Sequence, residues 1–124
     1  MKMNNAFVTL DGNLTRDPEM RQVGIYNVCN YTVAVNTDTK KEDGTYGTNY
    51  YDCSTWGSTG EYVFSKIKKG TEVTVVGELE AVEKPDANGE KRTRLRVKTY
   101  SVKVRRGARG SEPETSKPIE DDTI

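Results

Sequence analysis

The chain has no histidine and only two cysteines, Cys29 and Cys53, among its 124 residues. Histidine is the commonest general base in enzymes and, together with cysteine, a principal zinc ligand. The two cysteines have no CxxC spacing, so we expect each to be a small buried side chain rather than a metal ligand. These absences predict a protein that is not an enzyme and that needs no metal and no cofactor.

Long apolar runs are also missing. No stretch approaches the roughly 20 apolar residues that a membrane-spanning helix requires. The first five residues, MKMNN, lead directly into an alternating pattern, without the hydrophobic segment of a signal peptide. We therefore expect a cytoplasmic protein that does not contact a membrane.

The formal net charge is zero, but the charges are unevenly distributed. Residues 1–106 carry 17 basic and 14 acidic side chains, whereas residues 107–124 carry two basic and five acidic ones. The second segment is rich in Gly, Ser, Pro and Thr and has almost nothing to bury, which is typical of disorder. We expect one folded domain over 1–106, mildly basic, followed by a disordered acidic tail over 107–124.

Five short segments have the alternating or β-branched pattern of strands and are separated by turn residues. In the fifth, the apolar positions change parity half-way, which predicts a bulge. Short strands at this spacing predict an all-β domain, either a small barrel or a sandwich. The segments are Ala6–Leu14, Val28–Asn36, Asn49–Trp56, Thr71–Leu79 and Thr93–Val104.

A single helical signal lies between the third and fourth strand segments. Ser58 and Glu61 have the spacing of a capping box, Val63 and Ile67 share a helix face, and Gly70 ends the pattern. The polar connections 37–48 and 84–91 are long for hairpins, and we expect them to stand off the body as flexible arms. The sequence thus predicts a small β domain with one short helix and two arms.

The segment NYYDCSTW, residues 49–56, carries three aromatic side chains. In a strand, Tyr50 and Trp56 face one side, and Tyr51, Cys53 and Thr55 face the other. The small Cys53 and Thr55 suit a barrel interior, so we expect Tyr50 and Trp56 to point outward. Exposed rings of this kind stack on unpaired nucleic-acid bases. The alternative is that a partner subunit or a loop covers them, because aromatic side chains also favour interfaces.

Basic side chains accompany these rings. Four of them share one parity on the fifth strand segment: Arg92, Arg94, Arg96 and Lys98. The first arm adds the cations Lys40 and Lys41 and a further ring, Tyr46, and the second arm adds Lys84. Each cation alone could belong to a solvated surface, but together with outward rings they favour a track for phosphates. An OB-fold brings such strands and loops to one groove.

Five segments, in this order and spacing, resemble the bacterial and phage single-stranded-DNA-binding protein family: DGNLTRDPEMR, VCNYTVAVN, NYYDCSTWG, SKIKKGTEVTVVGEL and DANGEKR. The resemblance covers residues 4 to about 104. It implies a five-stranded OB-fold barrel with one short helix between strands 3 and 4. It also implies a homotetramer that binds and protects single-stranded DNA at the nucleoid during replication, recombination and repair. Tyr50 and Trp56 fall on the base-stacking positions, and Arg16 joins the residues expected to contact phosphates.

The chain departs from that family at several positions. Where members often carry further stacking aromatics, this chain has Thr39 and Lys84, and we expect Tyr46 to replace one of them. Members commonly end in acidic residues and a terminal Pro-Phe, which docks into genome-maintenance proteins. This chain ends in PIEDDTI, and we expect weaker docking through Glu120, Asp121, Asp122 and Ile124. The alternative is a tail that only aids solubility.

Two other functions remain open on the sequence alone. An OB-fold adaptor could use the aromatic face to bind protein instead of DNA. An RNA-binding domain is the second alternative, because stacking on bases barely distinguishes ribose from deoxyribose.

Overall fold

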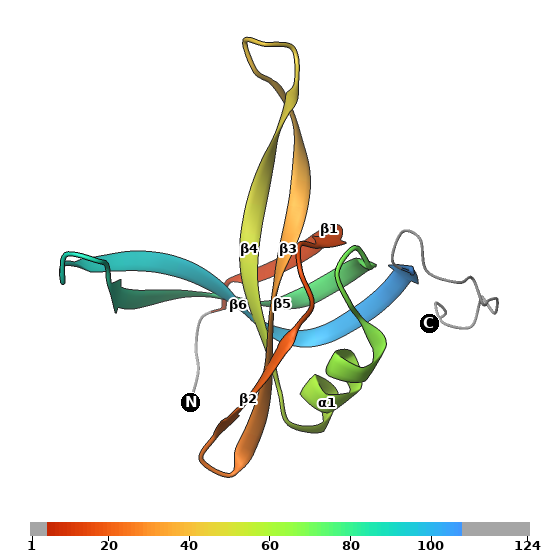
Figure 1. Ribbon diagram of the computed structural model, residues 1–124, viewed down its shortest axis with the longest axis vertical. Helices are drawn as coiled ribbons and strands as arrows, with labels where there is room; N and C mark the ends of the chain where they lie inside the picture. Colours follow the sequence, from red (N-terminus) through yellow and green to blue (C-terminus); the bar gives the residue numbers. More distant parts are fainter. Residues whose placement is uncertain (1–4, 108–124) are drawn as a thin grey trace.

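All five predicted strand segments form strands in the computed structural model, which describes residues 5–107 (Figure 1). The strands build one sheet in the order β1-β5-β6-β4-β3-β2, and β1 also pairs with β3 and closes the sheet into a barrel. All pairings are antiparallel except β4 with β6. The elements are β1 (Phe7–Leu14), β2 (Glu19–Val23), β3 (Tyr26–Lys40), β4 (Tyr46–Trp56), α1 (Gly57–Lys66), β5 (Glu72–Pro85) and β6 (Lys91–Arg106).

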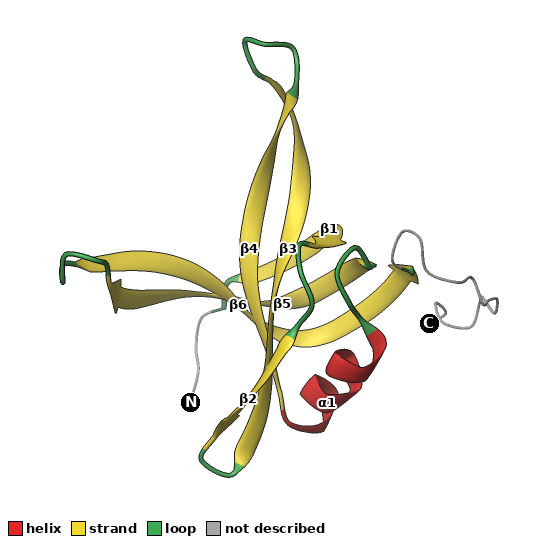
Figure 2. Ribbon diagram, viewed as in Figure 1, coloured by secondary structure: helices red, strands yellow, loops and turns green. Residues whose placement is uncertain are grey.

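The expected all-β OB-fold, with one helix after the third predicted strand, is confirmed (Figure 2). Strand β2 is additional to the five predicted segments and pairs with the first residues of β3. Its sequence, EMRQV, has no clear alternation. Gly24 makes the tight turn into β3 with a φ of 63°, a value that glycine adopts without strain.

The two predicted arms are β-ribbons rather than open loops. Strands β3 and β4 remain paired out to Lys40 and Tyr46, and β5 and β6 out to Pro85 and Lys91. Figure 1 shows both ribbons projecting from the barrel in different directions. Cross-strand pairing therefore holds both arms as ribbons, with a register shift in the β3–β4 ribbon between Asn36 and Lys40.

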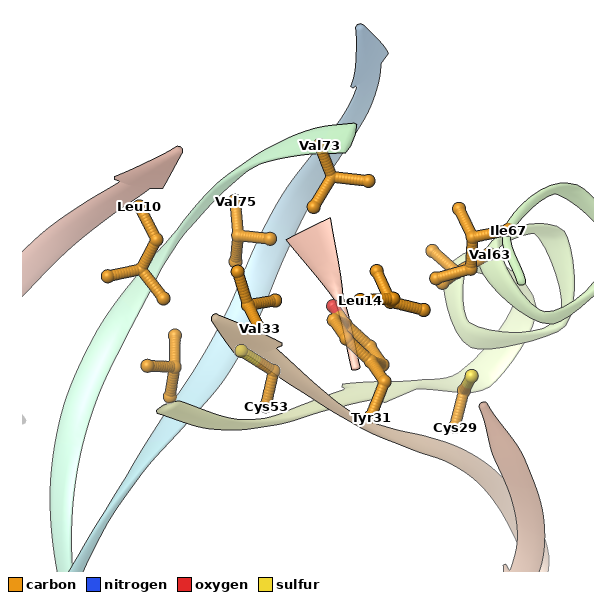
Figure 3. Packing of buried hydrophobic residues seen from close by; sticks show 11 residues of the cluster. Leu10, Leu14, Cys29, Tyr31, Val33, Cys53, Val63, Ile67, Val73 and Val75 are labelled. Carbon is orange, nitrogen blue, oxygen red and sulfur yellow. The ribbon is translucent and has the colours of Figure 1, made fainter. Parts of the chain in front are cut away.

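The barrel interior is filled by small and branched side chains (Figure 3). Tyr31 is the only aromatic side chain among the buried core residues of the described chain, and its hydroxyl lies 2.7 Å from Thr55 Oγ1 and donates to Thr99 Oγ1 at 3.3 Å. The remaining buried apolar residues are Leu10, Leu14, Val28, Cys29, Val33, Cys53, Val63, Ile67, Val73, Val75 and Val97. Burial of these apolar surfaces is the main term that stabilises the barrel.

Close approach of neighbouring strands depends on two glycines. A Cβ at Gly12 would clash with the Ala34 carbonyl oxygen, where β1 crosses β3. A Cβ at Gly77 would clash with the Lys98 carbonyl oxygen, beside a register shift between β5 and β6. That shift confirms the bulge predicted in the fifth segment.

Helix α1 packs against β3 and β4 at one end of the barrel. The predicted capping box is wrong, because the helix begins at Gly57 and its N-cap is Trp56, two residues before Ser58, without a side-chain hydrogen bond. Glu61 instead accepts a hydrogen bond of 2.8 Å from Asn27 Nδ2. None of the helices within residues 5–107 has the length and apolar character needed to cross a membrane.

Candidate nucleic-acid interface

Tyr50 and Trp56 point outward from β4. Their side chains are 66% and 39% exposed, whereas Cys53 and Thr55 are buried inside the barrel. The parity argument is therefore confirmed for the direction of the rings. A flat, accessible ring on a barrel wall can stack on an unpaired base.

The Trp56 ring is held by two neighbours on β3. Val28, buried, is its register partner, and the Tyr26 ring meets the indole edge to face, with centroids 6.4 Å apart and planes at 75°. Tyr26 is itself 57% exposed. Sequence reasoning missed it because the second predicted segment began at Val28, although Tyr26 has the parity of the outward residues of β3.

Polar side chains line the surface between the two rings. Ser54 Oγ donates to Asn30 Oδ1 at 2.7 Å, and Thr32 Oγ1 donates to Asp52 Oδ1 at 3.0 Å. Both are register pairs of β3 and β4, so all four side chains share the outer face with Tyr50 and Trp56. These four side chains form a polar floor, which carries hydrogen-bonding groups beside the two rings.

A groove of about 310 Å³ opens above the polar floor. Its walls come from β2, β6 and the start of the β5–β6 ribbon, together with the turn that precedes β2. Five cations line it: Arg16, Arg21, Lys84, Arg94 and Arg96. Sequence reasoning missed Arg21, because β2 was not recognised as a strand; its place directly across from Val28 puts it on the outer face.

Three of the predicted phosphate-binding arginines already have carboxylate partners. Arg92 Nε lies 2.8 Å from Asp86 Oδ2, and this contact holds the pKa of the Asp86 carboxyl below its usual value. Arg94 and Arg96 form ion pairs of 3.5 and 3.1 Å with Asp52 and Glu80. The phosphate track is therefore less positive than its arginines alone suggest.

The remaining predicted residues lie away from this groove. Lys40 and Tyr46 face each other near the tip of the β3–β4 ribbon, with the ammonium 5.9 Å from the ring centroid, and Lys41 follows in the turn. Lys98 is the register neighbour of Ser54 on β6 but does not line the groove. The predicted tail residues Glu120, Asp121, Asp122 and Ile124 lie outside the described residues.

The core thiols contribute no chemistry to this surface. Burial raises the pKa of Cys29 to about 11 and, with a smaller effect of the Asp52 charge, that of Cys53 to about 12. Both thiols therefore stay protonated at neutral pH, and a thiol is a far weaker nucleophile and ligand than a thiolate.

Comparison with known proteins decides the family. The model of the family described as "Single-strand binding protein family" matches residues 3–105. The chain belongs to this family. Among its relatives, "Single-stranded DNA-binding protein 1" of Clostridium acetobutylicum is 31% identical over 87 residues, which cover 68% of this chain and 79% of that protein.

Two longer relatives of the family are similar over more of the chain. The single-stranded DNA-binding protein of Treponema pallidum is 30% identical over 78% of this chain, and that of Wolinella succinogenes is 32% identical over 78%. These matches span 56% and 62% of the relatives' own lengths, less than two thirds in each case.

A solved structure has the same fold. The crystal structure of the small single-stranded DNA-binding protein from Streptomyces coelicolor superposes with a TM-score of 0.71. The match covers 83% of this chain and 96% of that one, at 19% sequence identity. The OB-fold of the family is therefore established for the chain.

Proposed function

We propose that the protein binds single-stranded DNA without sequence preference and protects it during replication, recombination and repair. The observation that carries the proposal is the pair of exposed rings, Tyr50 and Trp56, on the same outer face of β4 as Asp52 and Ser54. Asp52 and Ser54 line a groove that five cations also line. Stacking accepts any base, because every base has a ring face, and the cations attract the phosphates. Nothing in this activity requires catalysis, so we propose a binding protein and not an enzyme.

Each part of the surface has a role in this proposal. Tyr50, Trp56 and, on its ribbon, Tyr46 stack on bases, and Tyr26 extends the platform beside Trp56. The groove cation Arg21 joins the residues predicted to meet phosphates. Those are Arg16, Lys40, Lys41, Lys84, Arg92, Arg94, Arg96 and Lys98.

Assembly and partners follow from family membership and from the sequence. We propose a homotetramer that acts at the nucleoid in the cytoplasm, with residues 1–106 as the DNA-binding domain. The acidic tail over 107–124 would recruit genome-maintenance proteins through Glu120, Asp121, Asp122 and Ile124. An apolar last side chain with its carboxylate suits a basic, apolar pocket on a partner.

The test is titration of a labelled oligothymidine with the wild-type protein and with Trp56→Ala and Tyr50→Ala. Each variant should bind more weakly by roughly 1–3 kcal/mol, because it loses one stacked base. Quenching of tryptophan fluorescence should accompany binding of the wild type, since Trp56 is the only tryptophan. Tyr62→Ala is the matched control, because this ring is 54% exposed but lies on α1.

Unchanged affinity of both strand variants would refute the stacking role. A wild-type protein with no tight, length-dependent binding would instead support the adaptor that uses this face for protein. Competition between DNA and RNA oligomers of matched sequence decides between the two nucleic acids, and we expect DNA to bind at least as tightly.

A further inference from the structure

Four charged side chains form a row of alternating charge across three strands, and three of them, Asp52, Arg94 and Arg96, line the groove. The row runs from Glu80 on β5 through Arg96 on β6 to Asp52 on β4 and returns to Arg94 on β6, and we call it the charge row. Arg96 pairs with Glu80 at 3.1 Å, and Arg94 pairs with Asp52 at 3.5 Å. In register, Arg96 lies between Glu80 on β5 and Asp52 on β4. The formal charge of the row is zero.

The carboxylates of the charge row are held in place. Thr32 Oγ1 donates to Asp52 Oδ1, which leaves Oδ2 for Arg94. Glu80 Oε1 accepts from both Nε and Nη2 of Arg96, at 3.3 and 3.1 Å. A carboxylate fixed this way stays beside its guanidinium instead of moving freely in solvent.

The pairs are nevertheless accessible to an incoming phosphate. The Arg94 side chain is 63% exposed and its partner Asp52 is 50% exposed. Exposed ion pairs of this kind contribute little free energy, so a phosphate can displace the carboxylate. A DNA phosphate that enters the groove therefore meets a guanidinium that is reachable but already neutralised.

Other cations of the same groove lack such partners. Arg16, Arg21 and Lys84 also line it, and none of them forms an ion pair with a residue in 5–107. The groove thus combines cations without an ion pair with two arginines of β6, Arg94 and Arg96, that carboxylates neutralise. Only the row requires an ion pair to open before an arginine can bind phosphate.

We propose that Asp52 and Glu80 act as built-in counter-ions, which compete with DNA phosphates for Arg94 and Arg96 and so limit the affinity for single-stranded DNA. The proposal rests on the proposed function. Binding of phosphate to an unpaired cation releases salt ions from the DNA, whereas a carboxylate displaced from arginine attracts a salt cation again. The carboxylates therefore lower both the affinity and its dependence on salt.

The experiment compares the wild type with Asp52→Asn and Glu80→Gln in oligothymidine titrations at several salt concentrations. Each amide variant should bind roughly two- to fivefold more tightly at low salt, the range expected for one exposed ion pair. The slope of log affinity against log salt should steepen by up to about 0.7 for each phosphate gained. The advantage should shrink at high salt, where screening weakens the carboxylates in the wild type.

Glu83→Gln is the matched control. It removes one negative charge from β5, the strand of Glu80. Glu83 is exposed, lies between the groove-lining Val82 and Lys84 without lining the groove itself, and has no ion pair within the described chain. We expect its affinity to stay at the wild-type value. Equal tightening by the control would mean that net charge, not the charge row, sets the affinity, and would overturn the proposal.

Two further outcomes are decisive. Amide variants that bind like the wild type or more weakly, with unchanged thermal unfolding, overturn the counter-ion role while the wild-type titration still supports DNA binding. A wild type that does not bind oligothymidine overturns the proposed function, and the counter-ion role with it.

Discussion

Tyr31, Cys29 and Cys53 place three ionisable groups inside the barrel. The Tyr31 hydroxyl contacts the hydroxyls of Thr55 and Thr99, so the buried polar atoms of this cluster satisfy one another. Burial raises the pKa of all three groups, to about 11 for Cys29 and about 12 for Cys53. The folded barrel therefore holds these protons more tightly than the unfolded chain does.

Stability should fall in alkaline solution for this reason. The unfolded thiols lose their protons near pH 9, whereas the folded ones keep them until about 11 and 12. Above pH 9 the unfolded state binds fewer protons, so the free energy of unfolding decreases as pH rises, by up to about 1.4 kcal/mol per pH unit for each thiol. Urea unfolding followed at pH values from 7 upward measures this loss.

The control for this prediction is the double variant Cys29→Ala and Cys53→Ala, in which the alkaline decrease should become shallower. A wild-type stability that stays constant between neutral pH and about pH 10 would contradict the argument from burial.

At the scale of single residues, the sequence predicted correctly which face of β4 a side chain occupies, because side chains alternate between the two faces of a strand. The outward rings of Tyr50 and Trp56 followed from parity, together with the small size of Cys53 and Thr55 on the opposite face. The Asp52 partner of Arg94 did not, because Asp52 reaches β6 from β4, a strand far away along the chain. Pairing between distant strands depends on the register of the closed barrel, which no local pattern specifies.

At the scale of elements, the crossing of β1 over β3 depends on a position without a side chain. Gly12 lies where a Cβ would clash with the Ala34 carbonyl oxygen and contact the Val33 side chain. Backbone cannot move aside as a flexible side chain can. This contact closes the barrel, since the β1–β3 pairing joins the two sides of the sheet.

We expect Gly12→Ala to destabilise the fold by roughly 1–3 kcal/mol, the usual cost of forcing extra volume into a packed site. The measurement is the midpoint of thermal or urea unfolding. Thr9→Ala, at an exposed position of the same strand, should leave the midpoint nearly unchanged. Equal midpoints for Gly12→Ala and the wild type would show that the crossing tolerates a methyl group.

The elements that sequence analysis missed have physical reasons. Strand β2 lacks alternation and is held by its pairing with β3, so tertiary context forms it rather than propensity. The capping box failed because strand β4 runs directly into the helix, which puts Ser58 inside the first turn. The arms contain residues typical of loops, yet their strands stay paired because they extend the β3–β4 and β5–β6 pairings of the barrel.

At the scale of the whole molecule, β1, β5 and β6 carry an apolar patch on their outer face. Phe7 is 63% exposed, Tyr100 51% and Val76 37%, and the rings of Phe7 and Tyr100 meet edge to face at 6.3 Å. Exposed apolar patches on a barrel wall commonly mark contacts between proteins. This patch is our candidate for the contact between subunits of the proposed homotetramer.

Phe7→Glu tests this assignment. A charge buried in such a contact is costly, so the variant should be a smaller species than the wild type in mass measurements at equal concentration. Tyr62→Glu, which changes an exposed ring on α1, should keep the wild-type mass. Equal masses for Phe7→Glu and the wild type would place the contact elsewhere.

The parallel pairing of β4 with β6 has a consequence for how the protein is made. Cys53 is the register partner of Val97 there, so β6, the last strand within residues 5–107, must be synthesised before the barrel wall is complete. Chains are translated from the N-terminus, so β4 and β5 leave the ribosome before their partner strand β6 has been synthesised. We therefore expect a premature stop within β6 to leave β4 and β5 without a partner strand and to yield a chain that is degraded.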